Sequence, residues 1–389
     1  MKLLLHIGTH KTGTTALQQF LYANRALLAA FGFYYATPPH RLQEVNVIAN
    51  ALNAGNTDVV RTFFAKQLDL AERSGVDTIL ASAENFYAMS VLDAMKRREI
   101  CAKAVNRDRA LIETLHSLLP ADIGVCQFVC YFRRPDRYAE SLYSQHVKKG
   151  ILFDGTFDEF LPIITPALFY NTHMRAWSDV FGESSCIVRL YEPAKADIVS
   201  DFVEHVLGIG DASRFSKVGH HANERVSRDI LEFKRQQNTT AKPNERVIER
   251  TILRLLEEEM GSRKLEPDHN QDFLSPDGRA ALLRLHQPEM EALQATYDIP
   301  PFPLFDVDSA KRSWRRYPGL SQPKRQEIQL HYDRINGRLA FRVERLTLRS
   351  AGLLRKNVPS AGTLLDVLKA YGAKHALRRL MRRIQLGKS

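Results

Sequence analysis

The chain has 389 residues, with 44% hydrophobic and 25% charged side chains and a formal net charge of +11. This composition excludes wholesale disorder and a collagen-like repeat, and its four cysteines are too few for a disulfide scaffold. No apolar run reaches the ~18 residues of a membrane span, and the N-terminal run Leu3–Leu5 is shorter than the ~7–15 residues of a secretory signal, so we expect a cytoplasmic protein.

Strands and helices are expected to alternate over the first half of the chain. Five apolar runs predict buried strands, at residues 2–7, 31–36, 77–83, 124–132 and 185–191. Amphipathic spacing predicts helices between them, at residues 14–30, 41–76 (broken at 53–56), 88–118, 137–149 and 196–207. This alternation predicts the α/β class, with a parallel β-sheet flanked by helices.

Over the second half of the chain, the sequence pattern predicts only helices. They are expected at residues 224–238, 244–261, 278–296 and 323–345, with a polar loop or insertion at 263–276. We therefore predict one α/β domain over residues 1–345, with a helical part at 224–345, followed by a basic C-terminal extension at 346–389.

The charge excess is concentrated near the C-terminus. His331–Ser389 holds 14 Lys and Arg against 3 Asp and Glu, which leaves 41 of each among the first 330 residues. Arg378, Arg379, Arg382 and Arg383 share an amphipathic helical pattern with apolar neighbours. Such a helix can pack on the body, contact an anionic membrane surface or lipid, or bind another partner. The balanced body argues against a nucleic-acid-binding protein.

A glycine-rich loop is expected between the first strand and the first helix. It reads Gly8-Thr9-His10-Lys11-Thr12-Gly13-Thr14-Thr15. Backbone N–H groups of such a loop, together with a helix N-terminus, suit a phosphate. An NTPase loop would carry its lysine directly after the second glycine, where this chain has Thr14. Lys11, three residues earlier, suits a shorter phosphate chain.

The pattern H-x-G-x-x-K-T-G-T-T-x-L-Q, from His6 to Gln18, resembles the 5′-phosphosulfate loop of sulfotransferases that depend on 3′-phosphoadenosine 5′-phosphosulfate (PAPS), above all the bacterial members. The resemblance implies a P-loop-type sheet. It also implies that Lys11 stabilises the leaving 5′-phosphate and that Thr12, Gly13, Thr14 and Thr15 cradle it. PAPS is then the co-substrate, and no metal is required.

A second match to this family follows the fourth predicted strand. Arg133 and Ser141 are eight residues apart, which is the family spacing for residues that bind the 3′-phosphate. Pro135 resembles the carbohydrate sulfotransferases. Arginine offers a planar fork of donors to a phosphate, and we expect Ser141 in the first turn of the next helix. Arg134 and Arg137 are the alternative ligands.

Glu84 is the candidate catalytic base, since it directly follows the third predicted strand, and the carboxyl edge of a parallel sheet binds ligands. Ser-x-Glu at this position resembles family members that use a glutamate, and Ser82 could support Glu84 or the nucleotide. His10 and His146 are rival bases, whereas His6 is expected to be a hydrogen-bonded core residue. The pair His220-His221 lacks an evident third metal ligand.

These residues predict a sulfotransferase that moves a sulfuryl group in line from PAPS to a hydroxyl or amine, with Lys11 and Glu84 as catalytic residues. Segments 37–76 and 145–180 are expected to flank the acceptor cleft. The polar and aromatic groups considered for it suit a sugar and also many other small molecules: Tyr35, His40, Tyr87, Tyr143, Phe153 and Tyr170. The family resemblance implies a carbohydrate or glycolipid acceptor. Contact with the inner face of the membrane is a further expectation. A P-loop kinase or NTPase and a non-catalytic nucleotide-binding protein are the alternatives.

Overall fold

The computed structural model describes residues 1–36, 44–148, 151–191, 197–210, 212–216, 226–239, 252–253, 255–256, 258–260 and 272–350, with the backbone alone at 339–350. Two compact units emerge from the chain. The first comprises Met1–Leu142, Thr156–Ala222 and Leu274–Arg312, and the second comprises Tyr143–Gly155, Asn223–Phe273 and Ser313–Ser389. The predicted domain boundary after residue 345 stays a prediction, and residues 351–389 of the basic extension lie outside the described residues.

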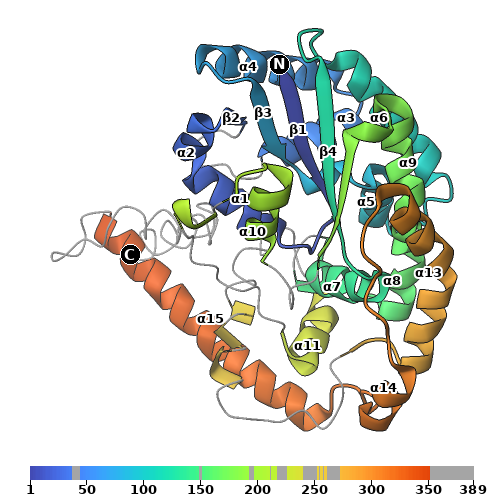
Figure 1. The fold of residues 1–389 in the computed structure, drawn as a ribbon. Coiled ribbons are helices and arrows are strands. Elements are labelled where there is room, and N and C mark those ends of the chain that lie inside the picture. Colours follow the sequence, from blue (N-terminus) through green and yellow to red (C-terminus); the bar gives the residue numbers. More distant parts are fainter. Residues whose placement is uncertain are drawn as a thin grey trace. The chain divides into compact units, whose positions relative to one another are not determined.

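A five-stranded parallel sheet forms the centre of the first unit (Figure 1). Its order is β2-β3-β1-β4-β5, with bounds Phe33–Tyr35, Thr78–Ser82, Lys2–Gly8, Val125–Phe132 and Cys186–Leu190. All four strand pairs are parallel, which confirms the predicted α/β class. The connection from β1 to β2 runs towards one edge of the sheet, whereas the connections from β2 to β3, β3 to β4 and β4 to β5 run towards the other edge, so a switch point lies beside β1. The carboxyl edge at such a switch point is where α/β proteins bind ligands.

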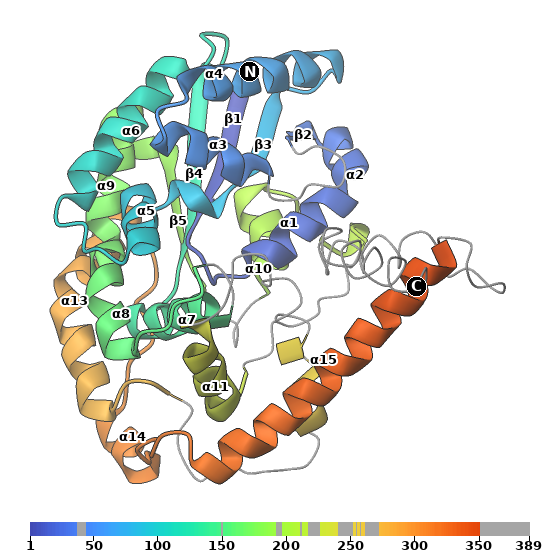
Figure 2. The same ribbon diagram turned by 180° about the vertical axis from the view of Figure 1, so that it is seen from behind.

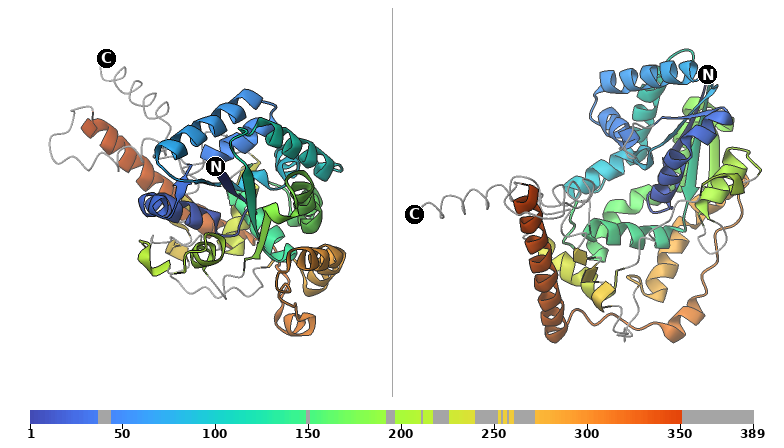
Figure 3. Two further views of the ribbon diagram at one scale, coloured as in Figure 1. Left: turned by 45° about the horizontal axis from the view of Figure 1, so that its top comes forward. Right: turned by 90° about the vertical axis from the view of Figure 1, so that its left-hand side faces the viewer.

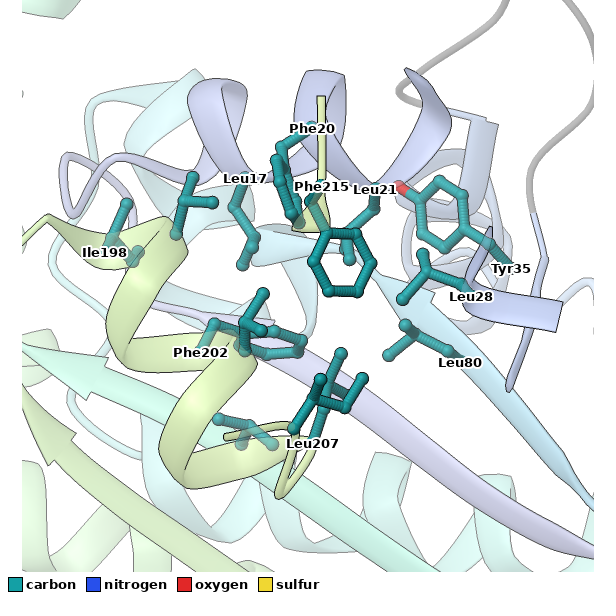
Figure 4. Packing of buried hydrophobic residues seen from close by; sticks show 14 of the residues in the cluster. Leu17, Phe20, Leu21, Leu28, Tyr35, Leu80, Ile198, Phe202, Leu207 and Phe215 are labelled. Atoms are coloured by element: carbon teal, nitrogen blue, oxygen red, sulfur yellow. The ribbon is translucent and has the colours of Figure 1, made fainter. Parts of the chain in front are cut away.

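One face of the sheet is covered by α1 (Thr14–Ala23), α2 (Arg25–Ala30) and α10 (Ile198–Asp201) (Figure 1). Buried apolar side chains from these helices and from the strands form one cluster, which Figure 4 shows at close range. It includes Leu4, Leu17, Phe20, Leu80, Val129, Phe202 and Phe215. This packing fixes α1, and therefore the loop before it, against the end of the sheet.

The opposite face is covered by α3 (Glu44–Asn53), α4 (Thr57–Arg73), α5 (Met89–Arg97), α6 (Ala104–Leu118) and α9 (Tyr170–Phe181), on which α13 (Pro276–Tyr297) packs (Figure 2). The left-hand view of Figure 3 shows the strands obliquely, with blue α1 and α2 on one side and teal α6 and green α9 on the other. Aromatic pairs link sheet and helix, with centroids 4.5 Å apart for Phe128–Trp177 and Phe132–Tyr170.

Most predicted helices are confirmed, with three differences. The predicted helix 14–30 divides into α1 and α2 at Asn24, whose side-chain amide donates to the carbonyls of Phe20 and Ser216. The predicted helix 88–118 divides into α5 and α6. Two helices, α8 (Phe157–Ile164) and α9, lie where the sequence analysis expected only an acceptor segment. The beginning of α8 is a reciprocal cap between Thr156 and Glu159.

The second unit contains α11 (Arg228–Asn238) and α15 (Gln322–Ser350). Apolar residues of these helices and of the segment 252–260 form a separate core, with Ile230, Phe233, Leu256, Ile328 and Ile335 among its buried members. The remaining helices are α7 (Pro135–Lys148) and α14 (Val307–Ser313). Of the helices that the structure describes, none is long and apolar enough to cross a membrane.

Candidate functional site

The loop between β1 and α1 is held by its own threonines. Thr9 donates from its amide and its hydroxyl to the carbonyl of Tyr131 at the end of β4, at 3.1 and 3.0 Å. The hydroxyls of Thr12 and Thr14 both donate to the carbonyl of Thr9, at 2.7 and 3.4 Å. A hydroxyl has one proton to donate. These two side chains therefore shape the loop. Among the residues that the structure describes, no backbone partner is found for the N–H groups of Thr12 to Thr15, which can therefore meet an anion.

Two glycines allow the loop to approach its neighbours. Gly8 has φ +123°, and a Cβ atom there would lie 3.1 Å from the carbonyl oxygen of Glu84. Gly13 has φ +80°, and a Cβ atom there would lie 2.9 Å from Ile198 and 3.3 Å from the ring of Tyr191. Both positions combine a left-handed backbone with contact too close for a side chain. The loop consequently lies directly against Glu84, two residues after β3, and against Tyr191, the residue after β5.

Lys11 and Thr15 are the first and last residues of the stretch that is expected to bind phosphate. Lys11 is half-buried and has φ +66°, so the backbone turns sharply there. Thr15 is exposed in the first turn of α1. The first N–H groups of a helix have no partner within the helix, and the helix dipole adds partial positive charge. The start of α1 and the lysine together suit a phosphate group.

Glu84 lies at the carboxyl edge of the sheet, as the sequence predicts. It is the first residue of a short 3-10 helix after β3 and is 8% exposed. The side-chain amide of Gln18, on α1, donates to Glu84 Oε2 at 2.9 Å and to the carbonyl of Ser82 at 3.3 Å. The helix that follows the loop, α1, therefore holds the Glu84 carboxylate beside the loop. The sequence analysis assigned no role to Gln18.

The histidines differ in their surroundings. His6 is fully buried, and its Nδ1 lies 2.8 Å from Ser82 Oγ, which confirms the expected core histidine. Burial lowers the pKa of His6 to about 4, although the negative charge of Glu84 opposes the shift. His10 lies half-buried in the loop, and His146 is buried on α7 in the second unit. His220 and His221 lie outside the described residues.

Neighbouring arginines after β4 have different environments. Arg134 donates to both oxygens of Asp136, at 2.7 and 3.0 Å, and to the carbonyls of Pro303 and Leu304. For the guanidinium of Arg133, by contrast, no hydrogen bond or ion pair is found with any residue that the structure describes. Burial, reinforced by the positive charge of Arg137, lowers the pKa of Arg133. Arg133 is thus a half-buried cation that has no paired anion within the described part of the chain.

Ser141 differs from its expected position. α7 begins at Pro135, because the fixed φ of proline suits the first helical position, and Ser141 is therefore the seventh residue of the helix. At 3.6 residues per turn it ends the second turn, so the expectation of a first-turn hydroxyl is wrong. Arg137 lies four residues earlier and on the same face of α7.

Arg279, on α13, binds two carboxylates of α7. It is 2% exposed, donates to Glu140 Oε1 at 2.8 Å, and forms a hydrogen-bonded ion pair with Asp136. Although burial would raise the pKa of Asp136, hydrogen bonds and charge from Arg134 and Arg279 hold it below its ordinary value. The sequence analysis missed Arg279, because no local pattern connects residues 143 and 139 positions apart.

Tyr191 connects the two predicted phosphate sites. Its amide donates to the carbonyl of Phe132 at 2.7 Å, and its ring is the one that faces Gly13. Burial raises the pKa of Tyr191, while the positive charge of Arg133 opposes the rise. Because Tyr191 meets Gly13 through its ring and Phe132, the residue before Arg133, through its amide, the structure brings together the loop and the arginine segment, which are some 120 residues apart in the sequence.

The predicted acceptor segments are less open than expected. Five aromatic residues that the sequence analysis considered suited to a sugar are buried: Tyr35, Tyr87, Tyr143, Phe153 and Tyr170. They pack in the interior and do not offer a stacking surface. Residues 37–43 and 149–150 of the two segments, which include His40, lie outside the described residues. Across the described ranges no group of three His, Cys, Asp or Glu side chains could hold a metal ion.

Comparisons with known proteins give one solved structure. No family model matches the chain, and no curated protein sequence matches it. A sulfotransferase from Alicyclobacillus acidocaldarius is similar in structure, with 13% sequence identity and a TM-score of 0.36. The match covers 77% of this chain and 97% of that one.

Proposed function

We propose that the protein is a PAPS-dependent sulfotransferase that moves a sulfuryl group to a hydroxyl or amine of an acceptor. One observation carries the proposal. A glycine-rich loop, a buried carboxylate and a guanidinium without an ion pair among the described residues lie at the carboxyl edge of one sheet. Gly8 lies against Glu84, and Tyr191 lies against Gly13 and bonds to Phe132, the residue before Arg133. The site therefore offers two separate positions for anions and one proton acceptor.

The residues present fit a nucleotide with two separate phosphate groups. Lys11 and the backbone N–H groups from Thr12 to Thr15 would hold the 5′-phosphosulfate. Arg133 would hold the 3′-phosphate, since a desolvated guanidinium without a partner gains most from a charge-assisted hydrogen bond. Ser141 is assigned to the same phosphate from the second turn of α7. Thr14 would contribute through its amide, because its hydroxyl already donates to Thr9.

PAPS, when bound, supplies an activated sulfuryl group whose leaving group is a phosphate. The residues of this chain would do the rest by position and charge. Lys11 would stabilise negative charge on the leaving 5′-phosphate. Glu84 would accept the proton of the acceptor hydroxyl on Oε1 or Oε2, and Gln18 would keep the carboxylate directed at the loop. No step in this scheme requires a metal ion.

The acceptor class is proposed from the resemblance alone. Arg133-Arg134-Pro135 resembles the carbohydrate sulfotransferases, so a carbohydrate or glycolipid is the proposed acceptor. A cytoplasmic location, with contact between the basic residues 346–389 and an anionic membrane surface, accords with a glycolipid acceptor and stays a prediction.

Thermal unfolding with nucleotides tests the proposal. The full chain would be heated with 3′-phosphoadenosine 5′-phosphate (PAP), with adenosine 5′-monophosphate (AMP), and with ATP and Mg²⁺. A ligand at ~100 times its Kd stabilises the folded state by about 2.7 kcal/mol, which raises the melting temperature by a few degrees. We expect the largest shift with PAP. K11M should reduce it, whereas K66M, at an exposed lysine on α4, should not.

The alternatives give other results. A shift with ATP and Mg²⁺ alone would contradict the proposal and favour a P-loop kinase or NTPase. A PAP shift in a protein that releases no sulfate or sulfated product from PAPS, with any of a panel of sugars and glycolipids, would favour a non-catalytic nucleotide-binding protein.

A further inference from the structure

Three asparagines form a stripe along α3. Asn46, Asn50 and Asn53 are spaced four and three residues apart, so they lie on one face of the helix. The neighbouring face is apolar and buried, with Val45, Ile48, Ala49 and Leu52. Asparagine is a poor helix former, because its side chain competes for backbone hydrogen bonds. The stability of α3 therefore does not explain three asparagines among its ten residues.

Two asparagines of this stripe bind the residue that follows Glu84. The backbone N–H of Asn85 donates to Asn46 Oδ1 at 3.1 Å, and the side-chain NH2 of Asn85 donates to Asn50 Oδ1 at 3.2 Å. Asn46 is 8% exposed, Asn85 is half-buried and Asn50 is exposed, so the amides run from the interior to the surface. These bonds fix the amides one residue away from the candidate base.

The bonds use only part of the hydrogen-bonding capacity of these side chains. A primary amide has two N–H donors and an oxygen that can accept twice. With the residues that the structure describes, no hydrogen bond is found for the side chain of Asn53, the side-chain NH2 of Asn50 or the side-chain oxygen of Asn85. The three residues therefore offer donors and acceptors to hydroxyl groups, which themselves both donate and accept.

The amides and the glycine-rich loop approach this segment from opposite faces of the sheet. The carboxylate of Glu84 bonds to Gln18 of α1, which covers one face, whereas Asn85 bonds to α3 on the other face. Consecutive residues of a 3-10 helix point about 120° apart, since the helix has three residues per turn. A hydroxyl at Glu84 therefore does not also meet the amides, which suit a second part of the acceptor.

We propose that Asn50, Asn53 and Asn85 form a subsite for hydroxyl groups of the acceptor, next to the hydroxyl that receives the sulfuryl group, and that Asn46 holds Asn85 in place. The inference rests on the proposed function and deepens it, because it assigns the residues that select the acceptor. The subsite carries no charge, and an amide left unpaired against an apolar surface is costly. It therefore favours a neutral group with several hydroxyls over an apolar one.

Glycan binding by the full-length protein, saturated with PAP, tests the inference. The wild type and N50L/N53L would be applied to an array of immobilised neutral glycans. Leucine is close to asparagine in size and is the better helix former, so the variant should fold and bind PAP as the wild type does. Loss of two hydrogen bonds should weaken binding of the best glycan about tenfold or more. If the double variant does not fold, N50L alone is measured in the same way.

N56L is the matched control. Asn56 is exposed, lies three residues beyond α3, and makes no side-chain bond at the start of α4. The same exchange there should leave both glycan and PAP binding unchanged.

Deoxygenated forms of the best glycan sharpen the test. Removal of a hydroxyl that contacts Asn50 should weaken binding to the wild type, but it should weaken binding to N50L no further, because the partner is already absent. A variant that lost affinity through altered packing would still discriminate among the deoxygenated forms as the wild type does, and that result would overturn the inference.

The outcomes separate this inference from the proposed function. A wild-type protein that binds PAP no tighter than AMP would overturn the proposed function, and the inference with it. A wild type that binds PAP but retains no glycan would overturn the inference alone, as would equal glycan binding by the wild type and N50L/N53L. Loss of PAP binding together with glycan binding in N50L/N53L would also overturn it, since the loss would then be structural.

Discussion

The loop Gly8–Thr15 and the segment Arg133–Ser141 both connect a strand to a helix at the same edge of the sheet, but they are held in different ways. The threonine side chains of the loop make most of their hydrogen bonds inside the loop, since the hydroxyls of Thr12 and Thr14 donate to the carbonyl of Thr9. The arginine segment depends on Arg279, Pro303 and Leu304, which lie far along the chain. A local motif can be identified from sequence, whereas a charge network assembled from distant residues cannot.

The difference extends to chemistry. In the loop, the hydroxyls of Thr12 and Thr14 hold the backbone in shape, and the backbone N–H groups of Thr12 to Thr15 are the groups proposed to bind an anion. In the arginine segment, Arg134 binds the buried Asp136, whereas Arg133 has no ion pair with any residue that the structure describes. Two adjacent arginines of the same sequence motif thus have opposite roles, and only their partners distinguish them.

The largest effect is expected at Glu84, which the loop approaches at Gly8. E84Q keeps the size and the bond to Gln18 but removes the proton acceptor, so sulfuryl transfer from radiolabelled PAPS should fall at least ~100-fold, the usual worth of a general base. PAP binding should be retained. E113Q, on the surface of α6, is the control. Turnover within threefold of the wild type would exclude Glu84 as the base.

The arginine segment is expected to be the more fragile of the two regions. D136N leaves Arg134 and Arg279 without their buried carboxylate, and breaking such a pair typically costs about 3–5 kcal/mol in the free energy of unfolding. Urea unfolding measures this loss. D69N, which breaks an exposed pair with Arg73 on α4, should change the same quantity by less than about 1 kcal/mol. Equal losses of unfolding free energy in D136N and D69N would show that the buried ion pairs contribute no more to stability than the exposed pair.

Arg133 should affect binding more than stability. R133A removes a charge-assisted hydrogen bond to the 3′-phosphate, and PAP affinity should fall about 10- to 100-fold while AMP affinity changes little. R109A, at an exposed arginine on α6, provides the comparison. Calorimetry gives both constants. An equal loss for the two nucleotides would mean that Arg133 does not contact the 3′-phosphate.

His6 should make stability depend on pH. With its pKa lowered to about 4, the folded protein binds fewer protons than the unfolded chain between pH ~4 and ~6.5, so stability falls as the pH drops through this range. At pH 5 the loss from this group is about 2 kcal/mol. H6N can keep the bond to Ser82 without titrating, and between pH ~7.5 and ~5 it should lose about 2 kcal/mol less than the wild type. Identical losses in urea unfolding would contradict this.

The smallest effect is expected within the loop. T12V removes the hydroxyl that donates to Thr9 at 2.7 Å, which should cost about 1 kcal/mol of unfolding free energy because Thr14 still donates to the same carbonyl. A loss as large as that of D136N would show that the loop is no more self-sufficient than the arginine segment.

The sequence by itself determined the class of fold and the local motifs. Apolar runs and amphipathic spacing predicted all five strands and most helices, because burial imposes a period of two or 3.6 residues on the chain. The glycine-rich loop and the position of Glu84 after β3 followed for the same local reason. The division of the first helix at Asn24 did not, since its partner Ser216 lies 192 residues away.

Only the tertiary structure decided which polar groups are paired. The sequence favours Arg133 by its spacing to Ser141 but leaves Arg134 and Arg137 as alternatives. Their partners in space distinguish them, since Arg134 binds Asp136, which Arg279 also binds from α13. Likewise, Gln18 and Tyr191 join the site because α1 and β5 pack against neighbouring strands. Pairing of buried charges depends on distances in space, and the sequence specifies those distances only through the complete fold.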